Sequence, residues 1–448
     1  MNQNKRVLLV YPTQDRLFEH PSLGLMYIAA VLEKAGHKVK IIEGSGLSLA
    51  DKCVNNVQTF KPDVVGFTCM TPHYNDVINA AQQIGNCGAS KPLIAVGGPH
   101  ATIMPETFAG TNVNVVVKGE GENAFAALLE EPEVWSGTDE PQICEGTPCE
   151  DLDVIPFPAR HLVNPEYFAR HRTPIMASRG CQFNCAFCQP TLRKIFGKKV
   201  RKRSAENVCA EMLQCRAQLG INHFEFFDDT FTSNPAWTEE FCSKAEQINN
   251  SSKADGFKKI SWEILTRVDS LTDDLVVKMK NSGMRRITFG VESGSQEILN
   301  GYQKGTTIKQ IKEAFAICKR HKIRTHGLFM LGSPEETWES IKATKQLIHE
   351  IKPDTIFISI TTPLPHTCLW DKAEKEQLLT CDWKKIDYYR TPSMKLKNLE
   401  QDEVIKAKHD ILRSFYQKRV LNPSWTYKYI QERGLSYGLT VAKHVLIE

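Results

Sequence analysis

The sequence contains no apolar run of the roughly 18 residues that a membrane-spanning helix requires. Its N-terminus has an apolar stretch too short for the core of a signal peptide, and no small-residue cleavage site follows. We therefore expect a chain with no membrane span and a cytoplasmic location.

A strong charge imbalance is also absent, since 56 Lys and Arg residues face 52 Asp and Glu, a net charge of +4. This balance is too even to predict binding to nucleic acid or to an anionic membrane. One segment differs, because Arg193 to Arg203 carries seven Lys or Arg in eleven positions and no acid. It is either a solvated loop or the binding site of an anionic partner.

Neither tandem repeats nor a disulfide-type cysteine framework is present. The 14 cysteines are scattered over 448 residues, which favours reduced and mostly buried thiols. A hydrophobic content of 41% beside 24% charged residues is typical of a globular protein. The length suits two or three domains.

Residues 1–135 alternate between strand and helix patterns and predict a doubly wound parallel sheet, an α/β fold. Amphipathic helices are expected at Leu23–Ala35 and Tyr74–Ile84. The expected strands are Arg6–Pro12, Lys38–Glu43, Asp63–Thr68, Leu93–Val96 and Val113–Val117. Ligands of such sheets bind beyond the carboxyl ends of the strands.

A proline-rich linker is expected over residues 136–171, and a second alternation follows over residues 172–370. Its six strand patterns predict a partial (β/α)6 barrel, whose chemistry would lie at the carboxyl ends of the strands. A small helical C-terminal region, residues 371–448, includes a helix at Glu403–Lys418. The expected barrel strands are Pro174–Ser178, Phe224–Phe227, Ser261–Leu265, Ile287–Val291, Thr325–Met330 and Thr355–Ile360.

The strongest chemical signal is Cys181-x3-Cys185-x2-Cys188, directly after the first expected barrel strand. A structural zinc site normally uses four protein ligands, and no partner pair of Cys or His follows here. Three thiolates on a 4Fe–4S cluster leave one iron open to a substrate. That iron can bind the amino and carboxylate groups of S-adenosylmethionine and pass an electron to its sulfonium. Zinc or a simple electron-transfer cluster remains the alternative.

This motif, in this position, resembles the radical S-adenosylmethionine superfamily over residues 172–370. The resemblance implies that Phe187 lies near the adenine, and that strand ends hold the rest of the S-adenosylmethionine. The segment after the second strand departs from the Gly-Gly-Glu form common in the family. A helix cap or an ion pair is the alternative role for the acids. The positions that match are Asp228, Asp229, Arg267, Glu292 and Ser293.

The N-terminal part resembles the cobalamin-binding domain fused to one branch of that superfamily. Three segments carry this resemblance: Pro21–Tyr27, Val96–Ala101 and Lys118–Glu122. The implied cobalamin contacts are Ser22, Leu23, Thr68, Thr71, His73, Gly97, Gly98, Pro99, His100, Gly119, Glu120, Gly121 and Glu122. A vestigial domain, or one that binds another nucleotide, is the alternative.

The Asp-x-His-x-x-Gly signature of domains that ligate cobalt through histidine is absent. We therefore expect cobalamin with its nucleotide tail inserted at the sheet edge and no histidine beneath the cobalt. Met70–Tyr74 is the segment expected beneath the ring, so His73 is the residue that could overturn this expectation.

Together the resemblances imply a C-methyltransferase that moves a methyl group from S-adenosylmethionine, via methylcobalamin, to an unactivated carbon of a small molecule. A cyclase, ring-rearranging enzyme or hydroxylase with the same cofactors is the alternative, and a non-catalytic cobalamin or redox sensor is another. An electron donor such as flavodoxin or ferredoxin is an expected partner. Arg193–Arg203 could then bind the cobalamin phosphate, a phosphorylated substrate or that donor. Cys368 is expected near the open face of the barrel.

Overall fold

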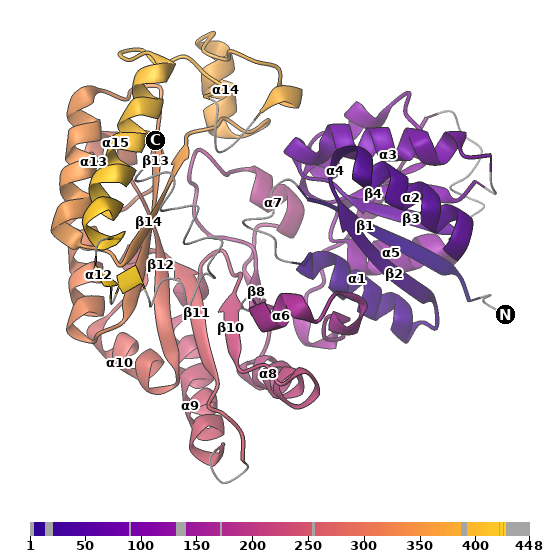
Figure 1. Cartoon of the computed structure of the whole chain (residues 1–448), viewed down its shortest axis with the longest axis horizontal. Coiled ribbons are helices and arrows are strands. Elements are labelled where there is room, and N and C mark those ends of the chain that lie inside the picture. The colour runs from indigo at the N-terminus through magenta and orange to yellow at the C-terminus, as the bar shows by residue number, and fades with distance from the viewer. Residues whose placement is uncertain are drawn as a thin grey trace.

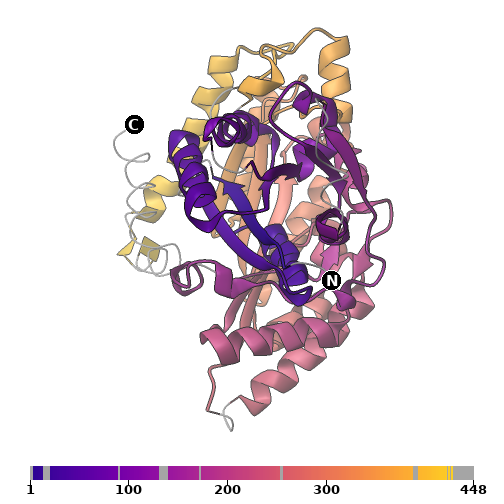
Figure 2. The same ribbon diagram turned by 90° about the vertical axis from the view of Figure 1, so that its right-hand side faces the viewer.

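The computed structural model describes residues 4–13, 21–88, 91–130, 140–170, 173–252, 256–386, 392–420, 422–423 and 425–426. Figure 1 shows two α/β bodies side by side, an indigo-to-purple N-terminal body and a larger one that runs from magenta to yellow. Each body is centred on its own six-stranded sheet. Viewed after a 90° turn, the N-terminal sheet lies in front of the second sheet (Figure 2).

The N-terminal sheet has the order β2-β1-β3-β4-β5-β6, and every pairing is parallel. Its helices cover both faces, as expected of a doubly wound fold. The strands are β1 (Arg6–Pro12), β2 (Lys38–Gly44), β3 (Val64–Thr68), β4 (Leu93–Gly97), β5 (Val115–Gly119) and β6 (Gln142–Gly146). The helices are α1 (Leu23–Lys34), α2 (Gly46–Phe60), α3 (Tyr74–Asn86), the short α4 (Pro99–Ile103) and α5 (Gly121–Glu130).

Alternate side chains of β1 divide the N-terminal core between the two faces. Val7 and Leu9 pack with residues of α1 and α5, whereas Leu8 and Val10 pack with residues of α2 and α3. Because β1 is buried on both faces, its residues form a continuous apolar run, and this run identified the strand in the sequence.

Strand β6 lies within residues 136–171, which the sequence predicted to be a linker, so the N-terminal sheet continues past residue 135. The prediction missed it because an edge strand need not be apolar. Of its residues only Cys144 is buried, and its sequence Gln-Ile-Cys-Glu-Gly lacks a β-branched run. Lys118 of β5 pairs with Glu145 across the ladder at 2.6 Å.

The second sheet has the order β14-β13-β12-β11-β10-β7, again parallel throughout, and it forms the expected open barrel. The strands are β7 (Thr173–Ile175), β10 (His223–Phe226), β11 (Ser261–Thr266), β12 (Met284–Glu292), β13 (Arg324–Leu331) and β14 (Thr355–Ile360). The larger helices around it are α8 (Ala205–Leu219), α9 (Pro235–Ser251), α10 (Asp273–Asn281), α12 (Ile308–Arg320), α13 (Trp338–Ile351) and α15 (Gln401–Val420). Short helices are α6 (Glu166–Arg170), α7 (Thr191–Phe196), α11 (Gln296–Gly301) and α14 (Cys368–Lys375).

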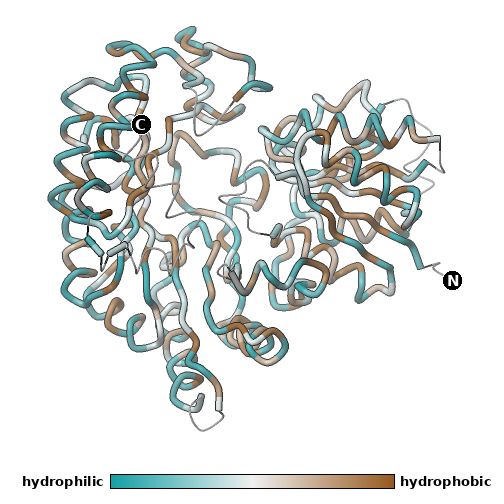
Figure 3. The backbone as a smooth tube through the Cα atoms, in the orientation of Figure 1, coloured by the Kyte–Doolittle hydropathy of each residue, from teal (hydrophilic) through white to brown (hydrophobic). Residues whose placement is uncertain are grey.

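Polar side chains begin most of the barrel helices. Ser204 caps α8, Asn234 caps α9, and both Thr307 and Thr337 form capping boxes at α12 and α13. These caps satisfy backbone N–H groups that have no partner within the helix. Figure 3 shows the resulting pattern, with hydrophobic strands inside and hydrophilic stretches on the outer helices.

The first expected barrel strand is shorter than predicted, because it ends at Ile175. The chain then forms β8 (Ser178–Arg179), which pairs antiparallel with β9 (Arg201–Lys202) rather than with the barrel sheet. The Asp228 carboxylate accepts a hydrogen bond from the Ala177 N–H at 3.0 Å and another from the Ser178 hydroxyl. A side chain thus replaces the ladder partner where the strand breaks.

The C-terminal region joins the two bodies beside α3. Asn75 Nδ2 donates to the Lys384 carbonyl at 3.2 Å, and the Trp383 ring lies 4.8 Å from that of His100 and 5.0 Å from that of Tyr74. Within the described ranges, no helix has the length and hydropathy needed to cross a bilayer.

Candidate functional site

The three cysteines lie on a loop, residues 181–190, that follows β8; we call it the cluster loop. Its backbone is held by other parts of the barrel. The Ala186 N–H donates to the Tyr302 carbonyl at 2.8 Å, and its carbonyl accepts from the Leu369 N–H at 2.9 Å. The Cys368 N–H donates to the Gln189 carbonyl at 3.0 Å. Cys368 therefore lies beside this loop, as its position after the sixth strand predicted, and its side chain is exposed.

Two buried cations face Cys185. Arg267 Nη1 lies 3.9 Å from the Cys185 sulfur, and the same guanidinium stacks 3.7 Å from the ring of Phe183. Lys304 is buried and is close enough to Cys185 for the two charges to interact. Thiolates and iron–sulfur clusters are anionic, so cations here favour both the thiolate and the reduced form of a cluster.

All fourteen cysteines are free, so the disulfide-free reading of the sequence agrees with the structure. Among the described residues, no three His, Cys, Asp or Glu side chains come close enough to hold one metal ion. A cubane differs from a single ion because each thiolate binds a different iron, so its ligands stand farther apart. Three soft sulfur donors on one loop fit that second kind of group.

The end of β12 carries a buried ion pair. Glu292 is in the left-handed region at φ 68°, where the register between β12 and β13 shifts, and its carboxylate pairs with Lys304 at 2.7 Å. A Cβ on Gly290 would lie 2.6 Å from Glu292 Oε1 and 2.9 Å from Lys304 Nζ. Glycine at this position leaves the space that the pair occupies. Functional sites often contain a residue other than glycine that its surroundings hold in a strained backbone conformation.

Lys304 was missed by the sequence analysis. It lies in the turn after α11, outside every strand end, and no spacing in the sequence connects it with Glu292. Its Nζ lies 5.8 Å from the ring centre of Phe187, and Phe187 packs edge-on against Tyr302 at 5.5 Å. Phe187 of the cluster loop therefore forms one group with Glu292 and Lys304.

The remaining residues predicted for S-adenosylmethionine differ in their freedom to bind a ligand. Asp228 is fully engaged at the break after β7. Asp229 is less buried, and burial together with Asp228 raises its carboxyl pKa to about 6. Ser293 contacts Thr344 of α13 at 3.3 Å, and Arg267 pairs with Asp269 at 2.7 Å.

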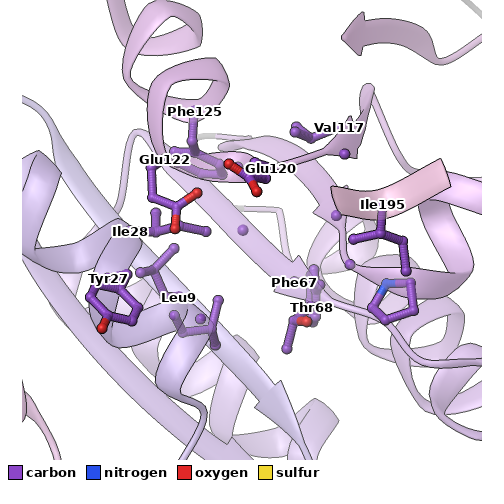
Figure 4. A pocket seen from close by; sticks show the side chains of 18 of the residues that line it. Leu9, Tyr27, Ile28, Phe67, Thr68, Val117, Glu120, Glu122, Phe125 and Ile195 are labelled. Atoms are coloured by element: carbon purple, nitrogen blue, oxygen red, sulfur yellow. The ribbon is translucent and has the colours of Figure 1, made fainter. Parts of the chain in front are cut away.

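A cavity of about 280 Å³ opens at the carboxyl ends of β1, β3, β4 and β5. It lies where the strand order reverses between β1 and β3, the place at which doubly wound sheets bind ligands. Figure 4 shows Leu9, Ile28 and Phe67 around this space, with Tyr27 on one side and Ile195 of α7 on the other. Its lining is mostly apolar and includes six glycines: Gly24, Gly66, Gly97, Gly98, Gly119 and Gly121.

Glycines shape this cavity because side chains there would fill or distort it. A Cβ on Gly24 would meet no atom within 4 Å, whereas one on Gly66 would lie 2.7 Å from the Phe125 ring. Gly98 has φ 94° and Gly119 has φ 79°, values that favour glycine. An apolar slot of this size suits a flat aromatic group and is too small for a whole corrin ring.

The predicted cobalamin contacts fall into two groups. The ones that line the cavity are Thr68, Gly97, Gly98, Pro99, Gly119, Glu120, Gly121 and Glu122. The others do not line it. Ser22 caps α1, Leu23 packs in the core, and His100 is fully buried, with its ring nitrogens 3.2 Å from the hydroxyls of Thr71 and Thr107. His73 is also buried, and its Nδ1 has no hydrogen-bond partner among the residues that the structure describes.

The basic segment is not one cationic surface, so neither a solvated loop nor an anion site describes its whole length. Arg201 and Arg203 are buried in ion pairs with Glu120 and Glu211. Lys202 donates to the Phe231 carbonyl at 3.0 Å and lies 4.5 Å from the Trp237 ring centre. The exposed remainder is Lys194, Lys198 and Lys199 on and after α7.

Two protein families match this chain in succession. The B12 binding domain matches residues 13–129, and the radical SAM superfamily matches residues 175–348. The first match covers β2 to β5 of the sheet with the glycine-lined cavity, and the second covers the cluster loop and most of the barrel.

Curated relatives match over most of their length. An uncharacterized methyltransferase of Pyrococcus horikoshii is 32% identical over 92% of this chain and 92% of its own. Cytidylyl-2-hydroxyethylphosphonate methyltransferase of Streptomyces wedmorensis is 28% identical over 74% of this chain and 73% of its own. The anaerobic magnesium-protoporphyrin IX monomethyl ester cyclase of Cereibacter sphaeroides is 26% identical over 90% of this chain and 68% of its own.

The fold is similar to that of the cobalamin-dependent S-adenosylmethionine radical enzyme OxsB, solved with aqua-cobalamin and S-adenosylmethionine bound. The TM-score is 0.73 at 16% identity, and the alignment covers 99% of this chain and 72% of OxsB. At this identity the likeness concerns the fold, namely a cobalamin-type sheet followed by a radical SAM barrel.

Proposed function

The chain belongs to the cobalamin-dependent radical S-adenosylmethionine enzymes, and on this basis we propose that it is a C-methyltransferase acting on a small molecule. The cofactors of this family are a 4Fe–4S cluster, S-adenosylmethionine and cobalamin, as the sequence predicted. The observation that carries the proposal is the pairing of a three-cysteine loop with a glycine-lined cavity in one chain. The methyltransferase named for Pyrococcus horikoshii, similar over 92% of both chains, supports methyl transfer.

We propose Cys181, Cys185 and Cys188 as the cluster ligands. When bound, these cofactors supply an electron, a carbon-centred radical derived from S-adenosylmethionine, and a methyl group held on cobalt. Arg267 and Lys304 place positive charge beside Cys185 and thereby favour the reduced cluster. Phe187 offers an aromatic face for the adenine, and Glu292 and Lys304 offer opposite charges for the amino and carboxylate groups of the methionine part.

We propose that the N-terminal cavity takes the nucleotide tail of cobalamin. Its apolar lining suits an aromatic base, and the glycine backbones at the ends of β4 and β5 allow close approach. We also propose that no histidine ligates the cobalt, because the side chains of His73 and His100 are both buried in the N-terminal body. The cob(II)alamin form should then show no nitrogen superhyperfine splitting in electron paramagnetic resonance. Splitting that disappears in His73→Ala would contradict this.

A reductant of flavodoxin or ferredoxin type is the protein partner that we propose. Such donors are acidic, and the exposed lysines on and after α7 provide complementary charge. Arg193 connects this helix to the cluster loop through a 3.3 Å hydrogen bond from its guanidinium to the Gln182 carbonyl. Free thiols and an iron–sulfur cluster both suit a reducing compartment, so we propose a cytoplasmic location.

The decisive assay is anaerobic reconstitution with iron, sulfide and cobalamin, followed by incubation with S-adenosylmethionine and candidate metabolites. Mass spectrometry should detect a product heavier by one methylene unit, together with 5′-deoxyadenosine and S-adenosylhomocysteine. Methyl-labelled S-adenosylmethionine should transfer its label to that product. A product formed without label, together with 5′-deoxyadenosine, would instead indicate the cyclase-type reaction named for the Cereibacter sphaeroides relative. No turnover of S-adenosylmethionine at all would indicate a sensor.

A further inference from the structure

The cluster-bearing segment leaves and rejoins the chain through one short antiparallel pair. In β8 and β9, Ser178 faces Lys202 and Arg179 faces Arg201. Residues 180–200, which we call the cluster excursion, contain the cluster loop and α7. Anything that holds Arg179 and Arg201 therefore holds both ends of the excursion.

Both arginines bind carboxylates of the N-terminal body. The Arg201 guanidinium forms two contacts with Glu120, one of them at 3.1 Å. Arg179 reaches Glu120 at 3.2 Å and Glu122 at 2.5 Å. None of the four side chains is more than 9% exposed, and two positive charges face two negative ones. Ion pairs between arginine and carboxylate are strong and directional when two N–H groups face two oxygens.

Three of these four residues form part of the wall of the N-terminal cavity. Glu120 lines it from the turn after β5, Glu122 from the first turn of α5, and Arg179 from β8. Arg179 also lies 5.5 Å from the ring centre of Tyr27, another lining residue. Ile195 and Phe196 of α7 also line the cavity. The excursion that carries the three cysteines thus supplies part of the cavity wall, where Figure 4 shows Ile195.

We propose that the cavity and the cluster excursion are thermodynamically coupled through the Arg179, Arg201, Glu120 and Glu122 clamp. Filling the cavity orders the excursion, and assembling the cluster orders the wall of the cavity. This inference rests on the proposed function, in which the cavity takes the tail of cobalamin. Because coupling between two sites is reciprocal, cluster assembly must raise the affinity for cobalamin by the factor by which cobalamin stabilises the cluster-bearing state.

The test is a titration of the full-length chain with hydroxocobalamin under anaerobic conditions, before and after reconstitution with iron and sulfide. We expect the reconstituted chain to bind cobalamin about 5- to 150-fold more tightly, the usual range of such couplings. In Glu122→Gln, which removes one charge from the clamp, the ratio of the two affinities should fall close to one. Glu145→Gln, on the neighbouring strand β6 and outside the clamp, should keep the ratio of the parent.

The use of a ratio separates coupling from any direct loss of cobalamin affinity in the variant. A ratio of one in the parent chain overturns the coupling, and so does a ratio in Glu122→Gln equal to that of the parent. If Glu122→Gln does not fold, Arg179→Lys tests the same clamp, because lysine keeps the charge but loses the forked geometry.

A second readout uses the parent chain alone. The electron paramagnetic resonance spectrum of the reduced cluster should change when cobalamin is added, and an unchanged spectrum overturns the inference. Failure of the proposed function gives a different result. A parent chain that binds no hydroxocobalamin in either state contradicts the cobalamin site itself, whereas binding with a ratio of one contradicts only the coupling.

Discussion

The candidate binding sites at the strand ends of the two sheets are built in opposite ways. In the N-terminal sheet the candidate site is a space left by absent side chains, with six glycines and mostly apolar walls. In the barrel it is made of side chains that are present: three thiols, a buried Glu292–Lys304 pair and Arg267. The first site selects by shape and the second by charge and sulfur chemistry. Adding atoms should therefore damage the first, and removing them should damage the second.

The largest effect is expected from removing sulfur from the barrel site. Replacing Cys181, Cys185 and Cys188 with Ala should abolish the visible absorbance of the iron–sulfur cluster and all formation of 5′-deoxyadenosine. The N-terminal cavity should still bind cobalamin, with the affinity of the unreconstituted parent, because its lining residues are unchanged. Cys87→Ala, at the end of α3, is the matched control and should keep both properties. A triple variant that still cleaves S-adenosylmethionine would refute the assignment of the cluster.

The next effect comes from adding atoms to the glycine-lined cavity. Gly24→Leu should place a side chain in open space within the cavity and weaken cobalamin binding about 100-fold, or roughly 3 kcal/mol. The matched variant Gly24→Ala adds a single methyl group that meets no protein atom within 4 Å. It should stabilise α1 by about 0.5–1 kcal/mol and retain most of the affinity. Equal binding by the Leu variant and the parent, measured by absorbance titration, would show that the tail binds elsewhere.

A smaller effect, on the pH dependence of stability, is expected from the buried polar groups, which differ between the two regions. The barrel compensates buried charges with partners, whereas His100 behind the N-terminal cavity is held neutral, because burial lowers the pKa of its imidazole to about 4. An unfolded histidine takes up a proton near pH 6.5. Between pH 6.5 and pH 4 the unfolded chain therefore binds more protons than the folded chain, and the folded state loses stability as the pH falls.

From pH 7 to pH 5 His100 should contribute a loss of about 2 kcal/mol to the free energy of unfolding. Urea denaturation followed through tryptophan fluorescence can measure it, since Trp383 packs against the His100 ring. Between pH 7 and pH 5, the free energy of unfolding of His100→Gln should fall by about 2 kcal/mol less than that of the parent. His409→Gln, on the exposed side of α15, should behave like the parent. The same pH dependence in parent and His100→Gln would argue against a neutral buried histidine.

The smallest effect should come from the surface between the two regions. Lys198→Glu combined with Lys199→Glu should slow flavodoxin-driven turnover a few-fold at low salt, because exposed charges steer association only weakly once screened. The difference should vanish at high salt, and dithionite-driven turnover should be unaffected. Lys309→Glu combined with Lys312→Glu, both on α12, is a control of equal charge change. A loss that persists with dithionite would place these lysines in the site rather than on a docking surface.

Sequence reasoning worked best where local pattern and burial agree. Strands β1 and β14 have the predicted bounds to the residue, since each is a continuous or alternating apolar run with a clear turn at its end. Edge elements were less predictable. Strand β6 is half exposed and β7 is cut short by the Asp228 carboxylate, and neither feature leaves a hydrophobic signature.

By itself the sequence determined the two α/β units, the cysteine spacing and the glycines at the ends of β4 and β5, because each is encoded within a few neighbouring residues. The pairing of Lys304 with Glu292, the burial of Arg201 against Glu120 and the completion of the cavity by α7 were decided only by the tertiary structure. Arg201 lies 81 positions from Glu120 in the sequence. From the sequence alone, a charged residue in a basic segment is expected to be exposed, because the carboxylate that pairs with it is brought close only by the fold. Burying a charge is costly without a partner, so whether Arg201 faces solvent or the interior depends on where the second sheet places it relative to the first.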